Sequence, residues 1–359
     1  MTLSPEDVNS LLENPSEATE LANLTYIVED RLSIQRKKVG RGFSYYKNGE
    51  KVKDQRTLER IKSLVIPPAW TNVRICSIKK GHLQVIGRDE KNRKQYLYHP
   101  LWSKLRNQTK FFKMASFGKT LPRIRKQVEQ DLELPKMTRR KVLALVIRLM
   151  EETHIRIGNA YYARENKTYG LSTLRGKHLK TDKNKIRFEF IGKKGKEQSV
   201  TIKNKRLIKL VNQCEEIPGW ELFKFYDEDG DKTPIDSGMI NEYIQDISGG
   251  DKFSAKDFRT WSASKIFFET LYELGYEEDE KRNKKNILTA YDTAAQGLGN
   301  TRAVCREYYV HPSIVKNYET GEIVEHFKKV RVRKEKNYQT LSGTEKVMLK
   351  MIEDYQIDI

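Results

Sequence analysis

Cysteine is scarce in this chain of 359 residues, which holds only Cys76, Cys214 and Cys305. The three lie far apart, and no Cys-x-x-Cys pair occurs. The composition therefore indicates neither a disulfide framework nor a cysteine-ligated zinc site, and it suits a reducing compartment.

Long hydrophobic runs are also missing. No apolar stretch approaches the roughly 18 residues that a bilayer crossing needs. The first residues, MTLSPEDV, do not combine a basic stretch with an apolar run as a signal peptide does. We therefore expect a soluble, cytoplasmic protein without a membrane partner, associated with the nucleoid if the source is bacterial.

Several common catalytic motifs do not occur. The sequence has no Gly-x-x-x-x-Gly-Lys-Ser/Thr loop and no His-Glu-x-x-His, and its six histidines show no ligand spacing. The acidic stretch 227–231 places its glycine wrongly for an EF-hand, so we interpret it as a solvated turn. We expect no metal site and no cofactor, and a nucleotide-hydrolysing motor is disfavoured.

Acidic residues are too few to balance the basic ones. Lys and Arg number 68 against 49 Asp and Glu, which gives a formal charge of +19. Basic side chains that bind phosphates release condensed counterions, so a surplus of this size favours a nucleic acid partner.

The secondary structure that the sequence predicts changes along the chain. Up to about residue 115 it is strand-like, with Asn48-Gly49 as a strong turn signal, and Ser4 and Pro5 begin a short first helix. Residues 116–359 are mainly helical: Thr138 caps one helix, and Ser342 caps the last. Between them we expect a hairpin over 186–202, helices near 205–216, 236–247 and 256–274, a helix ending near Gly299, a short helix before Pro312, and a basic tail at 328–336. The sequence thus predicts an α+β protein with a β-rich domain at 1–115 and a mainly α domain at 116–359.

Six segments, in order, resemble the small type IB DNA topoisomerases of poxviruses and bacteria. They are LVIPPAWTNV (64–73), GRDEKNRKQYLYHP (87–100), HIRIGN (154–159) with YGLSTL (169–174), FIGK (190–193), KDFRTW (256–261), and LGNT through VCREYYVHP (298–312). The resemblance implies a β-rich DNA-binding domain and a catalytic domain of the tyrosine recombinase and type IB topoisomerase type, closing as a clamp round double-stranded DNA. It also implies a monomer that needs neither metal nor ATP.

The same resemblance assigns catalytic roles. Tyr309 is the expected nucleophile, Arg156, Arg259 and Lys193 are the expected cations, and Asn300 is a further hydrogen-bond donor. Two arginines suit the nonbridging phosphate oxygens because guanidinium is planar and always charged. A lysine suits proton donation to the leaving 5′-oxygen, since its pKa shifts readily among other cations.

Each assignment has a competing interpretation. Lys194 and Lys196 adjoin Lys193, and Tyr308 adjoins Tyr309. In addition, Arg259 could simply pair with Asp257, and Asn300 could be only a helix N-cap.

Further candidates for DNA contact are Arg93, Gln95, Tyr96 and Tyr98 on a probable strand, with Asn159 and Tyr162 in the second domain. Arg and Gln reach base edges or phosphates, and tyrosines pack on sugars and bases. The alternatives to a type IB topoisomerase are a tyrosine site-specific recombinase, which shares the catalytic residues, and a noncatalytic basic DNA-binding protein.

Overall fold

The computed structural model describes residues 14–182, 184–331 and 337–356. The expected first helix at Ser4 and residues 332–336 of the basic tail lie outside the described residues. The chain divides into two compact units, one ending at Phe112 and the other running from Lys113 to Tyr355. Both this division and the predicted boundary at residue 115 fall within one long helix, α4 (Pro100–Leu132).

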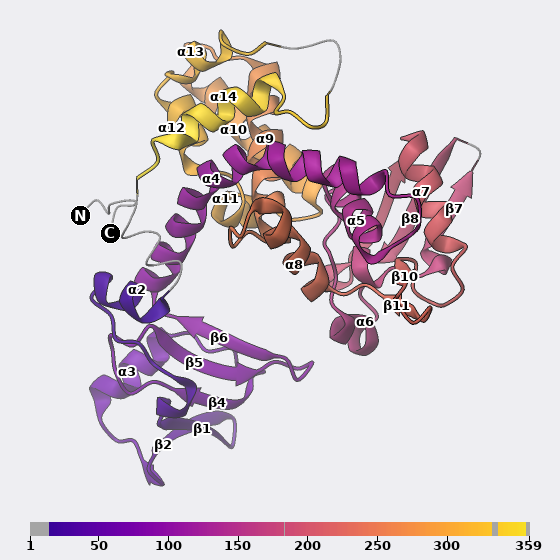
Figure 1. Cartoon of the computed structure of the whole chain (residues 1–359). Helices are drawn as coiled ribbons and strands as arrows, with labels where there is room; N and C mark the ends of the chain where they lie inside the picture. The colour runs from indigo at the N-terminus through magenta and orange to yellow at the C-terminus, as the bar shows by residue number, and fades with distance from the viewer. Residues whose placement is uncertain (1–13, 183, 332–336, 357–359) are drawn as a thin grey trace. The chain divides into compact units, whose positions relative to one another are not determined.

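The first unit is built on a six-stranded antiparallel sheet of order β3-β2-β1-β4-β5-β6 (Figure 1). The predicted turn at Asn48-Gly49 is confirmed: both residues have positive φ, 51° and 85°, as a tight hairpin between twisted strands requires. Its elements are α2 (Pro15–Leu21), η1 (Glu29–Arg31), β1 (Ile34–Val39), β2 (Gly42–Lys47), β3 (Glu50–Lys51), α3 (Gln55–Ser63), β4 (Thr71–Ile75), β5 (Leu83–Arg88) and β6 (Lys94–Tyr98).

Each face of this sheet buries its own apolar cluster. One cluster joins Ile61 of α3 to Ile34, Val73, Ile75 and Val85. The other joins Ile27 and Leu32, which precede β1, to Cys76, Leu83 and Ile86. Strand β6 lies at the edge of the sheet, so its outer side has no neighbouring strand among the described residues.

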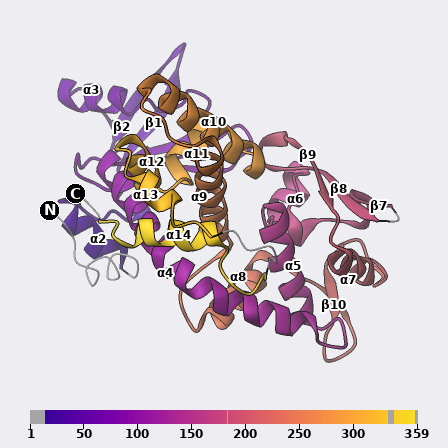
Figure 2. The same cartoon turned by 90° about the horizontal axis from the view of Figure 1, so that it is seen from above.

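The second unit is mainly helical and carries the three-stranded sheet β7-β8-β9. Helices α9 and α10 lie side by side (Figures 1 and 2). The predicted hairpin and the helix caps at Thr138 and Ser342 are confirmed, and Ser342 forms a capping box with Glu345. The elements are α5 (Arg139–Thr153), α6 (Ala160–Asn166), η2 (Leu171–Thr173), η3 (Gly176–His178), β7 (Leu179–Asp182), β8 (Lys185–Ile191), η4 (Lys193–Gly195), β9 (Glu197–Ile202), α7 (Lys205–Glu215), β10 (Lys224–Tyr226), β11 (Lys232–Pro234), α8 (Ser237–Ser248), α9 (Ala255–Leu274), α10 (Glu280–Leu298), α11 (Arg302–Tyr308), α12 (Pro312–Glu319), α13 (Ile323–Phe327) and α14 (Gly343–Glu353).

Helix α9 is held in place by close contacts with α4 and α14. A Cβ added at Gly118 of α4 would meet the Trp261 ring at 2.4 Å, so only glycine lets the two helices approach this closely. The Trp261 indole N–H donates to Glu345 Oε1 at 3.0 Å, and Glu345 in turn pairs with the buried Arg125 at 2.8 Å. These contacts fix the helix that carries Arg259.

No helix within the described ranges combines the length and the apolarity of a membrane span.

Candidate active site

The loop that carries Arg156 leaves helix α5 at His154, whose φ of 55° ends the helix in the left-handed region. Backbone hydrogen bonds then tie this loop to the 170–172 segment: Leu171 N donates to Arg156 O at 2.8 Å. A Cβ at Gly170 would lie 2.4 Å from Arg156 O, so a glycine is required for this approach. The backbone of Arg156 is therefore fixed on both sides.

Arg259 is buried, 6% exposed, and its guanidinium is oriented by two backbone carbonyls. It donates to His154 O at the end of α5 and, at 2.9 Å, to Leu298 O at the end of α10. Its Nε has no hydrogen-bond partner among the described residues. The alternative pairing with Asp257 is wrong, because Asp257 binds Ser254 at the start of α9 and pairs with Lys113.

The electrostatics around Arg259 suit an anion. Burial lowers the pKa of Arg259, and the nearby Arg156 lowers it further. The Tyr309 side chain partly offsets both effects, through its charge and through a hydrogen bond. The Arg259 guanidinium lies 5.7 Å from the centre of the Tyr309 ring. An anion bound between the two arginines would relieve their repulsion.

Asn300 lies between helices α10 and α11, and its side-chain oxygen accepts a hydrogen bond from Arg156 Nη2. Its side-chain nitrogen is buried without a hydrogen-bond partner in the described structure. The alternative reading of Asn300 as an N-cap is wrong, because Thr301 caps α11 by accepting from Val304 N at 3.4 Å. Asn300 thus offers one unused donor beside an arginine.

Three lysines lie in the turn of the β8–β9 hairpin. Lys193 is exposed there, yet partial desolvation lowers its pKa, and Arg156 lowers it further, while Tyr309 acts in the opposite direction. Lys194 has a positive φ of 65°, and the Lys196 carbonyl accepts from Gly192 N at 2.7 Å to close the turn. Lys193 is thus influenced by both Arg156 and Tyr309.

The two neighbouring tyrosines have different surroundings. Tyr309 caps the C-terminus of α11, and its carbonyl accepts from Ser264 Oγ of α9 at 3.2 Å. Tyr308 is 42% exposed, and a hydrogen bond with Glu307 is the largest cause that raises its pKa. The same α9 helix therefore holds Tyr309 from two sides, through Ser264 and through Arg259.

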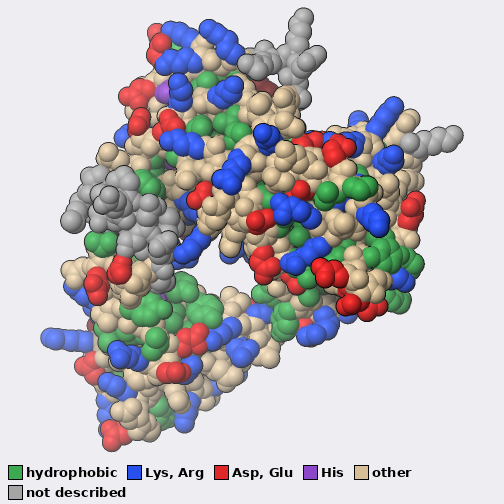
Figure 3. Space-filling view, in the orientation of Figure 1, with side chains coloured by type: hydrophobic (Ala, Val, Ile, Leu, Met, Phe, Trp, Pro, Cys, Tyr) green, Lys and Arg blue, Asp and Glu red, His purple; other side chains and the backbone are tan. Residues whose placement is uncertain are grey.

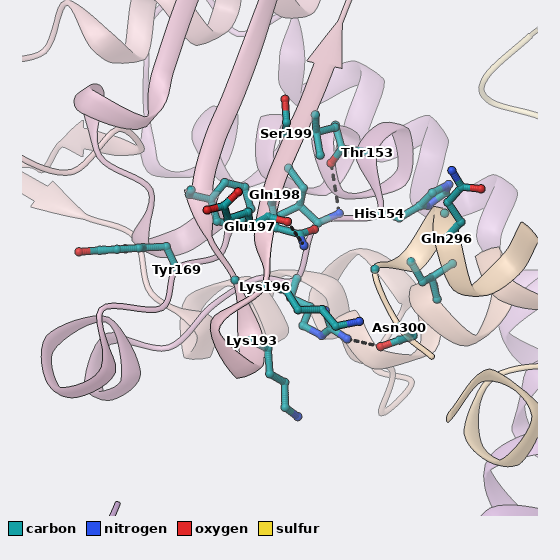
Figure 4. A pocket seen from close by; sticks show the side chains of 18 of the residues that line it. Thr153, His154, Tyr169, Lys193, Lys196, Glu197, Gln198, Ser199, Gln296 and Asn300 are labelled. Carbon is teal, nitrogen blue, oxygen red and sulfur yellow. Dashed lines mark hydrogen bonds between the residues drawn. The ribbon is translucent and has the colours of Figure 1, made fainter. Parts of the chain in front are cut away.

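Two cavities adjoin these side chains. The smaller, about 260 Å³, is lined by Asn300, by Tyr308 and Tyr309, and by four cations, Arg156, Lys193, Lys194 and Lys196. The larger, about 410 Å³, lies between the β8–β9 hairpin and the end of α10, and neither Tyr308 nor Tyr309 lines it. In this larger pocket Asn300 points inward, whereas the Lys193 side chain points out of it (Figure 4). The smaller cavity thus brings both tyrosines together with Arg156 and the lysines of the hairpin.

One buried histidine, His178, and one partly buried histidine, His154, make stability depend on pH. Burial, followed by Arg259, lowers the pKa of His154 to about 4, and burial, followed by Lys177, lowers that of His178 to about 4. Histidine in the unfolded chain titrates near 6.5. As pH falls below 6.5, the unfolded chain therefore binds more protons than the folded chain, and the folded state becomes less stable. For His154 this linkage costs about 2 kcal/mol of the free energy of unfolding at pH 5.

We therefore expect denaturant unfolding to show falling stability between pH 7 and pH 5, before most carboxylates titrate. A His154→Asn variant should show a shallower loss, because asparagine tolerates the left-handed backbone and carries no titrating group. If the free energy of unfolding fell equally steeply with pH in the variant and in the wild type, His154 would not be a source of the pH dependence.

The four candidates at β6, of which Arg93 directly precedes the strand, fall into two pairs with side chains on opposite faces. Arg93 and Gln95 both donate to Asp89 Oδ2, at 2.7 and 2.9 Å. Tyr96 and Tyr98 share the other face, where their rings stack with centroids 6.0 Å apart. A β-strand places alternate side chains on alternate faces, so this edge strand presents polar groups on both sides.

The remaining two candidates lie at helix α6. Asn159 is its N-cap, and its side-chain oxygen accepts from Tyr161 N at 2.9 Å. Tyr162 is 43% exposed and packs edge-on against Tyr161. The side-chain oxygen of Asn159 is therefore used within the protein. Only its amide N–H groups could donate to DNA.

Sequence reasoning missed the contribution of Ser264. Its hydroxyl donates to Tyr309 O and accepts from His311 N at 3.0 Å, which links α9 to both sides of Val310. Its position five residues after Arg259 carries no local signal, because the contact depends on how α9 meets the loop after α11.

Comparisons with known proteins agree with this geometry. Residues 92–337 match the family described as eukaryotic DNA topoisomerase I, catalytic core, and residues 42–89 match bacterial DNA topoisomerase IB, N-terminal domain. DNA topoisomerase 1B of Acanthamoeba polyphaga mimivirus is 34% identical over 297 residues, covering 80% of this chain and 88% of the relative. DNA topoisomerase 1B of vaccinia virus, strain Copenhagen, is 23% identical, covering 64% and 70% respectively. A solved structure of XerH site-specific recombinase on palindromic difH substrate is 18% identical, covering 66% of this chain and 59% of its own, with a TM-score of 0.34.

Both matched families consist of DNA topoisomerases, the class of enzyme that changes DNA topology. The chain belongs to the type IB DNA topoisomerase family. It is an ATP-independent DNA topoisomerase, and the alternatives of a recombinase and a noncatalytic DNA-binding protein are not favoured.

Proposed function

We propose that Tyr309 cleaves one strand of double-stranded DNA in the cavity that it shares with Arg156, Lys193 and Asn300. The observation that carries this proposal is the cavity itself, which places Tyr309 and its neighbour Tyr308 beside Arg156, the hairpin lysines and the amide of Asn300. Arg259, packed against the Tyr309 ring, supplies a third cation.

The reaction is a reversible exchange of phosphate esters. Tyr309 Oη attacks phosphorus and gives its proton to solvent water, the bond to the 5′-oxygen breaks, and a 3′-phosphotyrosine forms. Lys193 gives a proton to the departing 5′-oxygen, and its lowered pKa makes that transfer easier. Religation runs the same steps backwards after the free end has rotated, so the bond energy is kept throughout.

Arg156, Arg259 and Asn300 stabilise the charge that builds up on the phosphate. Guanidinium groups can donate to the nonbridging oxygens, and both arginines are already held in place by protein groups before DNA arrives. Preorganised donors of this kind need no reorganisation as the transition state forms.

The proposal extends to the assembly and to the place of action. All five catalytic candidates come from one chain, so a monomer suffices. Duplex DNA is the partner, and we propose that both units contact it in a clamp, with β6 and α6 supplying binding residues. Such an enzyme would act in the cytoplasm, at the nucleoid if the source is bacterial.

We expect the wild-type enzyme to relax both positively and negatively supercoiled plasmid in excess EDTA and without ATP. The three cationic side chains supply the charge that a metal ion would otherwise provide. Denaturing the reaction with detergent should trap a covalent protein–DNA adduct. Relaxation that fails in EDTA and returns with magnesium would overturn the metal-free mechanism, whereas a modest acceleration by magnesium would not.

A further inference from the structure

A segment that lies outside both family matches is part of the folded sheet domain. The matches begin at residue 42, whereas Thr25–Arg31 lies earlier in the chain. Its Ile27 is 2% exposed and packs on the sheet face formed by Cys76, Leu83 and Ile86. Tyr96 and Tyr98 are paired across the ladder with Ile86 and Leu83, so they lie on this same face.

Backbone contacts fix the segment beside β5. Thr25 N donates to Lys80 O at 2.8 Å, and Ile27 N donates to His82 Nδ1 at 3.0 Å. A Cβ at Gly81 would lie 2.9 Å from the Ile27 side chain, so a glycine is needed for this contact. Burial lowers the pKa of His82, which keeps its Nδ1 an acceptor at neutral pH.

The segment adds a tyrosine to the exposed rings of β6. Tyr26 stacks on His82 with centroids 4.7 Å apart and planes 6° apart, and His82 lies 6.2 Å from Tyr98. Tyr26, Tyr96 and Tyr98 are 42%, 40% and 43% exposed. Figure 3 shows side chains of the hydrophobic class, which includes tyrosine, gathered over the β6 side of this unit, with basic side chains beside them.

The segment also adds an acid to this basic surface. Glu29 forms an ion pair with Lys94, and its Oε1 accepts from the Tyr96 hydroxyl at 3.3 Å. The Lys94 contact lowers the pKa of Glu29 and raises that of Lys94, so both stay charged. A carboxylate here occupies the donors that a DNA phosphate would use.

We propose that Tyr26 and Glu29 are parts of the DNA-contacting face of β6, with opposite effects on affinity. The Tyr26 hydroxyl binds a backbone phosphate of the duplex. Glu29 competes with phosphates for Lys94 and Tyr96, and so lowers the affinity for DNA of any sequence. This inference rests on the proposed function, which assigns β6 to duplex DNA.

Binding of a fluorescent duplex over a series of salt concentrations tests both residues. Glu29→Gln should bind several-fold more tightly than wild type, and the slope of log K against log salt should steepen by about 0.9, as one more phosphate contact requires. Glu50→Gln, in the β2–β3 hairpin, makes the same charge change away from Lys94 and is the matched control. If the two variants behave alike, Glu29 acts only through net charge and the proposal fails.

Tyr26→Phe keeps the ring that stacks on His82 and removes only the hydroxyl. It should bind roughly three- to tenfold more weakly, as expected for one lost hydrogen bond. Tyr98→Phe tests whether this face of β6 contacts DNA at all. If Tyr98→Phe weakens binding and Tyr26→Phe does not, only this inference is wrong. If neither change matters, the assignment of β6 to DNA has failed.

Discussion

A Tyr309→Phe variant is expected to form no covalent adduct with DNA and to relax no plasmid. The substitution removes the attacking oxygen and leaves the ring that packs beside Arg259. Duplex binding should stay within a few-fold of wild type, because one hydroxyl contributes little against many phosphate contacts. Adduct formation on a nicked or suicide duplex, read on a denaturing gel, measures the chemical step, and a filter or anisotropy assay measures binding.

The neighbouring tyrosine provides the matched control. Tyr308→Phe should cleave and religate, because the Tyr308 side chain is 42% exposed and interacts with Glu307 instead of Arg259. Both side chains line the same small cavity, so proximity alone does not choose between them. An inactive Tyr308→Phe protein together with an active Tyr309→Phe protein would reverse the assignment.

Sequence patterns predicted the elements whose signals are local. Thr138 and Ser342 cap helices as expected, since a cap depends on a side chain and a backbone N–H three residues away. The β8–β9 hairpin follows from alternating apolar residues on either side of a glycine-containing turn. Such signals need no knowledge of the rest of the fold.

Helix α4 was not predicted: its first half, up to residue 115, was expected to be strand-like, and local rules argue against a helix in its second half. Gly118 and Pro122 both disfavour helix interiors. Tertiary packing decides otherwise: Gly118 makes room for the Trp261 ring, and Phe117 and Leu121 are fully buried in the core. Neither contact can be inferred without knowing where α9 lies.

Sequence motifs predicted which residues form the candidate active site. They did not predict the contacts that hold those residues in place. Two backbone carbonyls, His154 O and Leu298 O, orient Arg259, and they come from helix ends 105 and 39 residues away. Asn300 was open to interpretation as a cap because it follows Gly299 and precedes a helix. The structure gives the cap to Thr301 and turns Asn300 toward Arg156.

This arrangement makes Asn300→Asp the most informative change after the nucleophile. The aspartate would place a carboxylate oxygen where Asn300 Oδ1 now accepts from Arg156, and the charged pair would be stronger. The guanidinium would then be neutralised, and the new charge would repel the phosphate. Two unit charges 4 Å apart at an effective dielectric constant near 20 interact by about 4 kcal/mol, or roughly a thousandfold in rate.

We therefore expect Asn300→Asp to fold with a near-native melting temperature and to lose cleavage by about three orders of magnitude. Asn300→His should keep substantial activity, because histidine also donates a hydrogen bond from a short planar side chain. Thr301→Ala should show the reverse pattern: it loses the helix cap, which costs about 1 kcal/mol of stability, and it keeps the phosphate contacts. Single-turnover cleavage and thermal melts of the three variants separate the roles. An Asp variant that cleaves at the wild-type rate would mean that Asn300 does not face the phosphate.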